Sequence, residues 1–243
     1  AALIDAALSG GIVSGTGTGA LTKNGGGTLN LTAAGTYTGQ TFVNGGVLVL
    51  NHANALPGGV ATAGGTSNLR FGGNGIAGLG TGDFTRALGT GVDQVQWTGS
   101  GGFAAFNADR VVNLGGAGAT VTWATGSFVP NGSTLYLGAN SATHTVDFQN
   151  PIDLGSANRT IDINSSAAAA LDAIISGSIS GSGGLTKNGD GTLLLQSTAS
   201  SYTGQTNLAV NVTRVTKLAD FGQPSSLGAG TAGVPITMAS AFR

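Results

Sequence analysis

The sequence predicts an all-β protein, a parallel β-solenoid in which short strands are joined by Gly- and Asn-rich turns. Three observations lead to this prediction. A long segment occurs twice, apolar and polar residues alternate over many short stretches, and the 243 residues include 45 Gly but no Glu. We expect one solenoid over residues 1–243, with a repeat unit at 4–170, the opening of a second unit at 171–243, and no significant α-helix.

The repeated segment reads LTKNGGGTLNL at residues 21–31 and LTKNGDGTLLL at residues 185–195. Nine of these eleven positions are identical, and the copies match again as TYTGQT at 36–41 and SYTGQT at 201–206. Such self-similarity is typical of repeat proteins, whose stacked units share one continuous core. We expect structural roles for the shared residues, which are Leu21, Lys23, Gly25, Gly27, Leu29, Tyr37, Gly39, Leu185, Lys187, Gly189, Gly191, Leu193, Tyr202 and Gly204.

Strands are expected where apolar and polar residues alternate, because each strand then buries one face. In chain order these segments are 28–32, 94–97, 120–124, 135–137, 146–148, 160–164 and 193–195. The alanine-rich residues 167–175 are expected to form a loop that leads into a strand.

Turns are expected at the Asn-Gly pairs that begin at Asn24, Asn44, Asn131 and Asn188, because both residue types tolerate positive φ. Such turns fit the tight hairpins of an antiparallel sandwich and the corners of a parallel solenoid equally well. The long repeat favours the solenoid. Coils of about 22 residues would then give about eleven strands stacked into a rod of ~50 Å.

The segments LTKNGGGTLNL…YTGQTFVNGGVLVLN and LTKNGDGTLLL…YTGQT resemble the autotransporter-associated β-strand repeat, also called the passenger-associated transport repeat. Residues 82–103 and 109–130 resemble the spacers that alternate with this repeat, so the resemblance covers most of the chain. It implies a right-handed, single-stranded parallel β-helix that a bacterium exports through its outer envelope. The second copy departs from the pattern at residues 207–223, which replace the expected Asn-Gly-Gly-x-Leu element.

Composition excludes several classes of protein and site. A net charge of −1 argues against nucleic-acid and anionic-membrane partners, both of which need a basic patch. With no Cys, the chain has no disulfide, thiol nucleophile or thiolate metal site. No apolar run approaches the roughly 18 residues of a membrane span.

Three glycine and carboxylate motifs suggest ligands but lack essential parts. Gly73-x-Gly75-x-x-Gly78 matches a dinucleotide fingerprint without the helix and acidic residue that complete it, and fits a glycine-rich turn better. The same stretch opens like a calcium-binding nonapeptide but has Ala77 where Asp is needed. Asp190 corresponds to Gly26 in the first copy, and one carboxylate cannot supply the six to eight oxygen ligands of Ca²⁺.

Catalytic side chains are equally sparse. His52 and His144 have no partner at zinc-ligand spacing. Ser141, His144 and Asp147 are close in sequence, but on a strand His144 would point away from the other two. Asp147, Asp153 and Asp162 are candidates for a hydrolytic carboxylate pair on one wall of adjacent coils, although solvated turn residues are the favoured interpretation.

Tyr37, Tyr136 and Tyr202 are candidate stacking surfaces for sugars or partners. We favour a structural role at a corner for Tyr37 and Tyr202, because they occupy the same position of the repeat.

The leading functional hypothesis is a non-enzymatic extracellular element, an autotransporter-passenger-like stalk or adhesin at the outer membrane or outside the cell. Its expected partners are further coils stacked end to end, because neither end shows a capping helix, and host or cell-surface glycans or proteins. The alternatives are a self-assembling filament subunit and a glycan-active enzyme on the same scaffold. No catalytic, cofactor-binding or metal-ligating residue is assigned.

Overall fold

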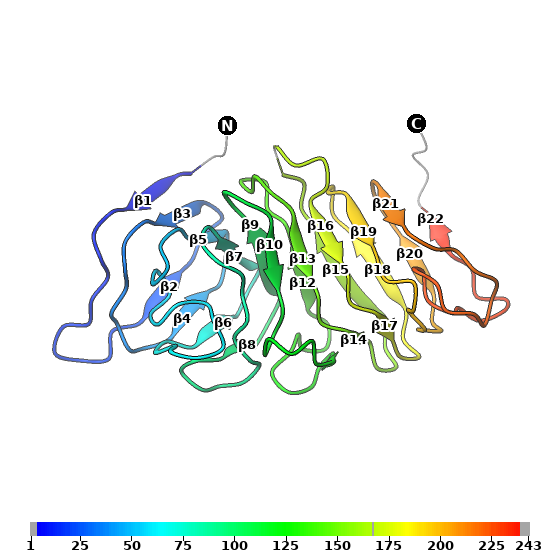
Figure 1. Cartoon of the computed structure of the whole chain (residues 1–243), viewed down its shortest axis with the longest axis horizontal. Helices are drawn as coiled ribbons and strands as arrows, with labels where there is room; N and C mark the ends of the chain where they lie inside the picture. The colour runs from blue at the N-terminus through cyan, green and yellow to red at the C-terminus, as the bar shows by residue number, and fades with distance from the viewer. Residues whose placement is uncertain (1–3, 167, 239–243) are drawn as a thin grey trace.

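The computed structural model describes residues 4–166 and 168–238, and over these residues the chain forms a parallel β-helix (Figure 1). Every pairing between its named strands is parallel and joins one coil to the next, as in the step from β3 (Thr28–Leu31) to β5 (Val47–Leu50). No helix occurs within the described ranges, so none there is long and apolar enough to span a membrane. The all-β solenoid prediction is confirmed, and the antiparallel sandwich is not formed.

The longest sheet has ten strands and runs the whole length of the molecule. Its members, in spatial order, are β1 (Ala6–Leu8), β3 (Thr28–Leu31), β5 (Val47–Leu50), β7 (Gly75–Leu79), β9 (Gly101–Ala105), β12 (Thr134–Leu137), β15 (Arg159–Ile163), β18 (Leu185–Asn188), β20 (Thr206–Leu208) and β22 (Thr237–Met238). We refer to it as the long sheet.

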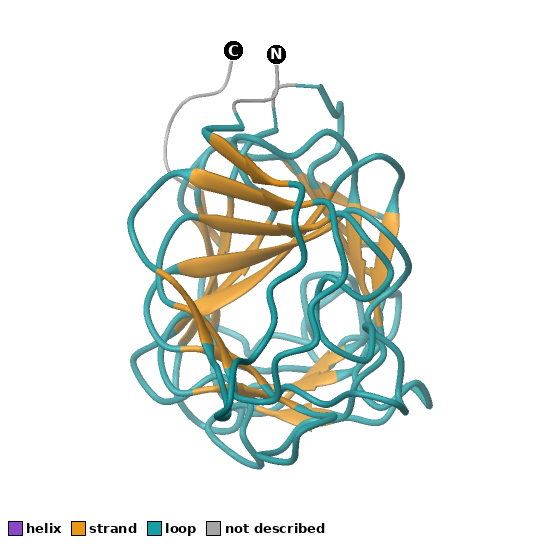
Figure 2. Cartoon of the chain, turned by 90° about the vertical axis from the view of Figure 1, so that its left-hand side faces the viewer, coloured by secondary structure: helices purple, strands orange, loops and turns teal. Residues whose placement is uncertain are grey.

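Three shorter sheets form the other walls around the interior (Figure 2). A four-stranded sheet lies in the N-terminal half and contains β2 (Leu21–Lys23), β4 (Thr41–Val43), β6 (Leu69–Phe71) and β8 (Val95–Trp97). A five-stranded sheet begins later and contains β10 (Arg110–Val112), β13 (Val146–Phe148), β16 (Ala173–Ile175), β19 (Leu193–Leu195) and β21 (Thr213–Val215). The three-stranded sheet contains β11 (Val121–Thr122), β14 (Ile152–Asp153) and β17 (Ile179–Ser180).

The coils differ in length far more than the sequence suggested. One coil separates Leu29 from its register partner Leu48, a step of 19 residues. Another separates Phe103 from Leu137, a step of 34 residues. The expectation of a uniform coil of about 22 residues was therefore wrong, because surface loops of different lengths are inserted between strands that keep their stacking.

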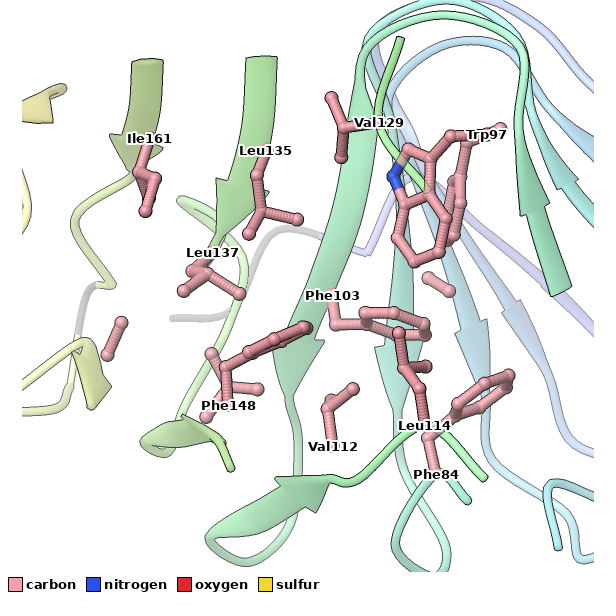
Figure 3. Packing of buried hydrophobic residues seen from close by; sticks show 14 of the residues in the cluster. Phe84, Trp97, Phe103, Val112, Leu114, Val129, Leu135, Leu137, Phe148 and Ile161 are labelled. Atoms are coloured by element: carbon pink, nitrogen blue, oxygen red, sulfur yellow. The ribbon is translucent and has the colours of Figure 1, made fainter. Parts of the chain in front are cut away.

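Inward side chains form one continuous apolar core along the helix axis. Its middle is a series of aromatic rings in contact, including Phe71 with Trp97 at 4.9 Å between ring centres and Phe84 with Phe103 at 4.7 Å. Figure 3 shows Leu135, Leu137 and Phe148 continuing this core toward the C-terminal half. The alternation read from the sequence thus identified the buried faces of these strands.

The two copies of the repeat lie on different walls. In the first copy, the LTK strand β2 belongs to the four-stranded sheet and the following TLNL strand β3 to the long sheet. In the second copy, the LTKN strand β18 belongs to the long sheet and the following strand β19 to the five-stranded sheet. The spacer between the copies therefore does not correspond to a whole number of turns of the β-helix.

Turns and loops follow the sequence expectations with one change. Gly25 and Gly189 have φ of 73° and 78°, a conformation that glycine adopts without steric cost. In the Asn44 turn, Gly46 rather than Gly45 has the positive φ, 62°. The alanine-rich stretch enters β16 at Ala173 as expected, and its first residue, Ala167, lies outside the described residues.

Candidate functional site

The lysine of each repeat binds backbone carbonyls of two successive coils. Lys23 Nζ donates to the oxygens of Asn24, Gly25 and Gly45 at 3.0, 2.8 and 3.0 Å. Lys187 Nζ donates to those of Gly189, Gly191 and Val210 at 3.0, 2.7 and 2.8 Å. Burial lowers the pKa of both lysines, for Lys187 in spite of nearby Asp162. Each lysine therefore fastens a turn to the turn of the next coil.

The tyrosine of each repeat is a buried corner residue. Tyr37 and Tyr202 are 1% and 0% exposed, and each hydroxyl pairs with the Thr four residues later, Thr41 or Thr206, at 2.7 and 2.8 Å. Burial raises the pKa of both tyrosines, that of Tyr202 to about 12. Because both rings are buried, these two residues offer no stacking surface to a ligand.

In each repeat, a glycine between the tyrosine and the threonine lets successive coils approach closely. A Cβ on Gly39 would lie 2.6 Å from the carbonyl oxygen of Gly19, and one on Gly204 would lie 2.4 Å from the carbonyl carbon of Gly183. Gly27 and Gly191 are crowded in the same way by a neighbouring coil, at 2.6 Å from Asp5 and 2.7 Å from Ile163.

The repeat leucines point into the core. Leu185 and Leu193 are 1% and 0% exposed, whereas Leu21 and Leu29 are only partly buried and pack against the core near the first coil. These positions, with the Lys, Tyr and Gly positions, place the repeat motif in scaffolding.

Arg86 is a buried cation whose role was not predicted from the sequence. Arg86 is 0% exposed and donates to carbonyl oxygens of Pro57, Gly59 and Ser67. Burial lowers its pKa to about 10. These hydrogen bonds connect the long loop between β5 and β6 to the following coil. The one sequence feature that indicates this role is the isolation of Arg86 in an apolar, glycine-rich stretch.

The three carboxylates proposed as a hydrolytic group lie on three different sheets. Asp147 is in β13, Asp153 in β14 and Asp162 in β15. Asp147 accepts a hydrogen bond from the Ser176 hydroxyl at 2.7 Å, and Asp153 accepts one from its own turn. The idea that they share one wall was wrong, because one coil turns through all three sheets within these few residues.

The other suggested catalytic and ligand motifs have local structural partners. Of the stretch from Ser141 to Asp147, only the last two residues belong to a strand, β13, so the premise that Ser141, His144 and Asp147 share one strand was wrong. His144 Nδ1 pairs with the Thr143 hydroxyl at 2.9 Å and Ser141 with the hydroxyl of Thr28 at 2.9 Å.

The glycine motif and the Asp190 turn are also accounted for. Gly75 begins strand β7, where a dinucleotide motif needs a helix. Asp190 accepts a hydrogen bond from the Ser165 amide at 3.0 Å, which fits a plain turn. His52 Nδ1 accepts one from the Asn54 amide at 3.1 Å.

A groove lies on the outer face of the long sheet. Cross-strand register places Thr28, Val47, Ile76, Gly102 and Tyr136 in one row across five strands, and Asp5, just before β1, adjoins Thr28 at the end of this row. The cavity over this row has a volume of about 390 Å³. Tyr136 is half-buried, and burial and Asp162 raise the pKa of its phenol.

The loop 138–145 covers part of this face. Ala139 and Ala142 pack on Val49 and Phe106, a second apolar cluster on the side opposite to the main core. Its tip is fixed by the hydrogen bond from the Thr28 hydroxyl to Ser141, across 113 residues of sequence. The groove thus has an apolar floor and an ordered edge.

One feature of the sequence indicates that the outer face of the long sheet is covered, although it is not an alternation of apolar and polar residues. Val47–Leu50 is a continuous apolar run with all four residues buried. Such runs are typical of strands covered on both faces. Ala139 and Ala142, which cover the outer face of this strand, lie about ninety residues away, and the local sequence does not predict that contact.

These observations define the class of protein as a β-helix of repeated coils whose motif residues hold the scaffold together. A sequence profile of the Passenger-associated-transport-repeat family matches residues 21–50 and 185–209. The chain therefore carries passenger-associated transport repeats at these two segments, as the resemblance in the sequence indicated.

One curated relative is the Adhesin BmaC autotransporter of Brucella suis biovar 1 (strain 1330). It is 31% identical over 220 residues, which are 86% of this chain and 5% of that protein. The chain thus spans a small fraction of this relative's length. No solved structure matches the chain.

Proposed function

We propose that this chain is a non-enzymatic structural and adhesive segment of a bacterial surface protein, comparable to part of an autotransporter passenger. The observation that carries the proposal is the alignment of most of this β-helix with an autotransporter adhesin. The protein would act outside the cell, associated with the outer membrane. The long sheet would hold binding surfaces away from the cell.

The arrangement of polar groups supports a non-enzymatic role. The buried cations bind backbone carbonyls, as for Lys187 and Arg86, and the buried tyrosines bind threonines. Asp147 and Asp153 accept hydrogen bonds from nearby groups on separate walls. Acid–base hydrolysis needs two carboxyl groups that face one substrate, so the glycan-active enzyme has less support than the adhesive element.

The two ends of the long sheet favour contact with further coils. β1 and β22 each pair with one neighbour, and the apolar side chains there include Leu8 at 41% and Met238 at 54% exposure. Unpaired strand edges of this kind are templates for further pairing. We propose that additional coils of one longer polypeptide cover them, with units such as 4–170 in succession; stacking of separate chains into a filament is the second candidate.

A segment exchange in the parent polypeptide tests the adhesive role. Cells that display the polypeptide are compared with cells in which residues 4–238 are deleted, or replaced by an equal number of coils from elsewhere in the same protein. We expect adhesion to host cells to fall in both variants, and antibodies against the segment to bind intact cells. Full adhesion after replacement would limit the segment to a spacer. Absence of antibody binding to intact cells would contradict surface display.

A further inference from the structure

We propose that the groove on the outer face of the long sheet binds one or two residues of a neutral glycan, with the ring of Tyr136 as its stacking surface. This inference rests on the proposed adhesive function and names the ligand class of that function. It is carried by the shape of the groove, the chemistry of its lining and its charge.

The size and the floor of the groove suit a small ring. Its volume of about 390 Å³ lies at the lower end of the range of ligand-binding pockets. Val47 and Ile76 form an apolar floor, and Tyr136, which is partly buried, stands in the same cross-strand row. A pyranose has an apolar C–H face, which gains contact with an aromatic ring while the hydroxyl groups stay solvated or hydrogen-bonded.

The absence of a side chain at Gly102 shapes this arrangement. Gly102 lies in the row between Ile76 and Tyr136, and a Cβ on it would come within 1.8 Å of the Tyr136 carbonyl oxygen. The close approach of β9 and β12 at this glycine brings the tyrosine and the loop 138–145 toward the N-terminal strands. The hydrogen bond between Thr28 and Ser141 then holds the edge of the groove in place, so little ordering is needed on binding.

The polar groups around the floor match hydroxyl groups. The side chains of Asn74, Asn140 and Asn164 line the groove, the first two exposed and the third half-buried. A carboxamide offers two N–H donors and one carbonyl acceptor, so it can pair with sugar hydroxyls, which both donate and accept. Three such groups around an aromatic ring provide orientation in addition to apolar contact.

The charge of the site selects a neutral ligand. Asp5 is the one ionisable carboxylate among the described lining residues, and these include no Lys, Arg or His. Asp162, in register beside Tyr136 on the next strand, adds a second negative group nearby. A sialylated, sulfated or phosphorylated glycan would meet repulsion from Asp5, with no cation among the lining residues. A neutral sugar meets none.

A glycan-binding measurement on the purified 243-residue protein tests the inference. The protein is applied to an array of neutral and anionic oligosaccharides, and dissociation constants for bound sugars are then measured by titration. We expect binding to neutral sugars and a loss of about tenfold in Tyr136→Ala, with Tyr136→Phe close to wild type because the ring is retained. Phe42→Ala is the matched control, since Phe42 is a half-buried aromatic on the four-stranded sheet.

The outcomes separate the two proposals. Because Tyr136 is at the surface, we expect its variants to remain folded. Thermal unfolding of each variant checks this. Failure of the folded protein to bind any neutral sugar, binding of anionic sugars alone, or unchanged affinity in Tyr136→Ala would overturn the glycan inference. If adhesion still depended on residues 4–238 in the segment exchange, the adhesive function would stand with a ligand of another class.

Discussion

Lys23 and Lys187 are examples of charged residues that serve as scaffold in a protein with few charges. Each places an ammonium group among three carbonyl oxygens at a turn where coils stack. An ammonium has three donors and no acceptor, so this arrangement satisfies it without a carboxylate. The lysine is the same in both copies because backbone carbonyl oxygens at the stacked turns need its three donors.

Replacing Lys187 by Met should destabilise the β-helix. The change keeps the length of the side chain but leaves three carbonyl oxygens at a buried turn without their donor. We expect the free energy of unfolding to fall by about 2–3 kcal/mol, measured by urea denaturation. Lys217, whose side chain is exposed, provides the control Lys217→Met, which should unfold near the wild-type midpoint. Equal midpoints for both variants would contradict the structural role.

Gly39 tests the close approach of coils. In Gly39→Ala the added carbon would lie 2.6 Å from the Gly19 carbonyl oxygen, so backbone must move, and we expect a loss of about 1–3 kcal/mol. Gly26 is the control from the same repeat, because nothing lies within 4 Å of an added Cβ there. A neutral Gly39→Ala, with Gly26→Ala also neutral, would show that the coils are farther apart than the structure has them.

At the scale of the element, the Tyr-Thr-Gly-Gln-Thr corner combines three features of the repeat. The tyrosine ring fills the interior, its hydroxyl binds the closing threonine, and the glycine allows the previous coil to lie against the corner. This explains why the segment recurs nearly unchanged although the strands around it belong to different sheets.

The corner predicts an alkaline loss of stability. The pKa of Tyr202 is about 12 in the folded protein and 10.0 for the free side chain. Between these values the unfolded chain releases the phenolic proton while the folded chain keeps it, so stability falls as pH rises from about 10 to about 12. The loss should reach about 2–3 kcal/mol from this one group.

The measurement is the urea midpoint as a function of pH, for the wild type and Tyr202→Phe. The variant has no phenol at position 202 and should show a shallower decline, while Tyr37 and Tyr136 are common to both proteins. The buried lysines have lowered pKa values and favour the folded state increasingly as pH rises, but they are present in both proteins and cancel in the comparison. Parallel curves would contradict the buried phenol.

The local sequence pattern predicted the core and the corners of this architecture but not the groove on its outer face. Leu135, Leu137 and Phe148 were assigned to the core from alternation alone, and Tyr37 and Tyr202 to a corner from their repeat position. The groove was not predicted, because Thr28 and Ser141 meet across 113 residues. Such a contact depends on the lengths of the intervening coils, which no strand pattern encodes.

At the scale of the whole molecule, the main finding is that the repeat motif changes walls while the long sheet continues. The change occurs where β12 stacks on β9 of the long sheet, after which the four-stranded sheet has ended. As a result, β2 and β18, which have the same sequence motif, lie in different sheets. If similar units follow one another in a longer polypeptide, we expect equivalent surfaces to face different directions along it.

The junction between β9 and β12 can be tested by disulfide formation, since the chain has no Cys to interfere. The amide of Thr134 lies 3.0 Å from the Ser100 hydroxyl, and these residues precede the paired residues Leu135 and Gly101. In-register positions of neighbouring strands are about 4.8 Å apart, within the span of a disulfide. Thr134 is in register with Thr186 of the second copy, and Gln96 is in register with Thr22, the equivalent residue of the first copy. Gln96 would therefore be the neighbour of Thr134 if the copies lay on the same wall.

The most direct measurement is therefore the oxidation of two double variants, followed by intact mass and thiol titration. Ser100→Cys with Thr134→Cys should form an intramolecular disulfide in the folded protein, and Gln96→Cys with Thr134→Cys should keep both thiols free. Cross-linking of the second pair and not the first would contradict the change of wall, and with it the continuous ten-stranded sheet on which the groove is built.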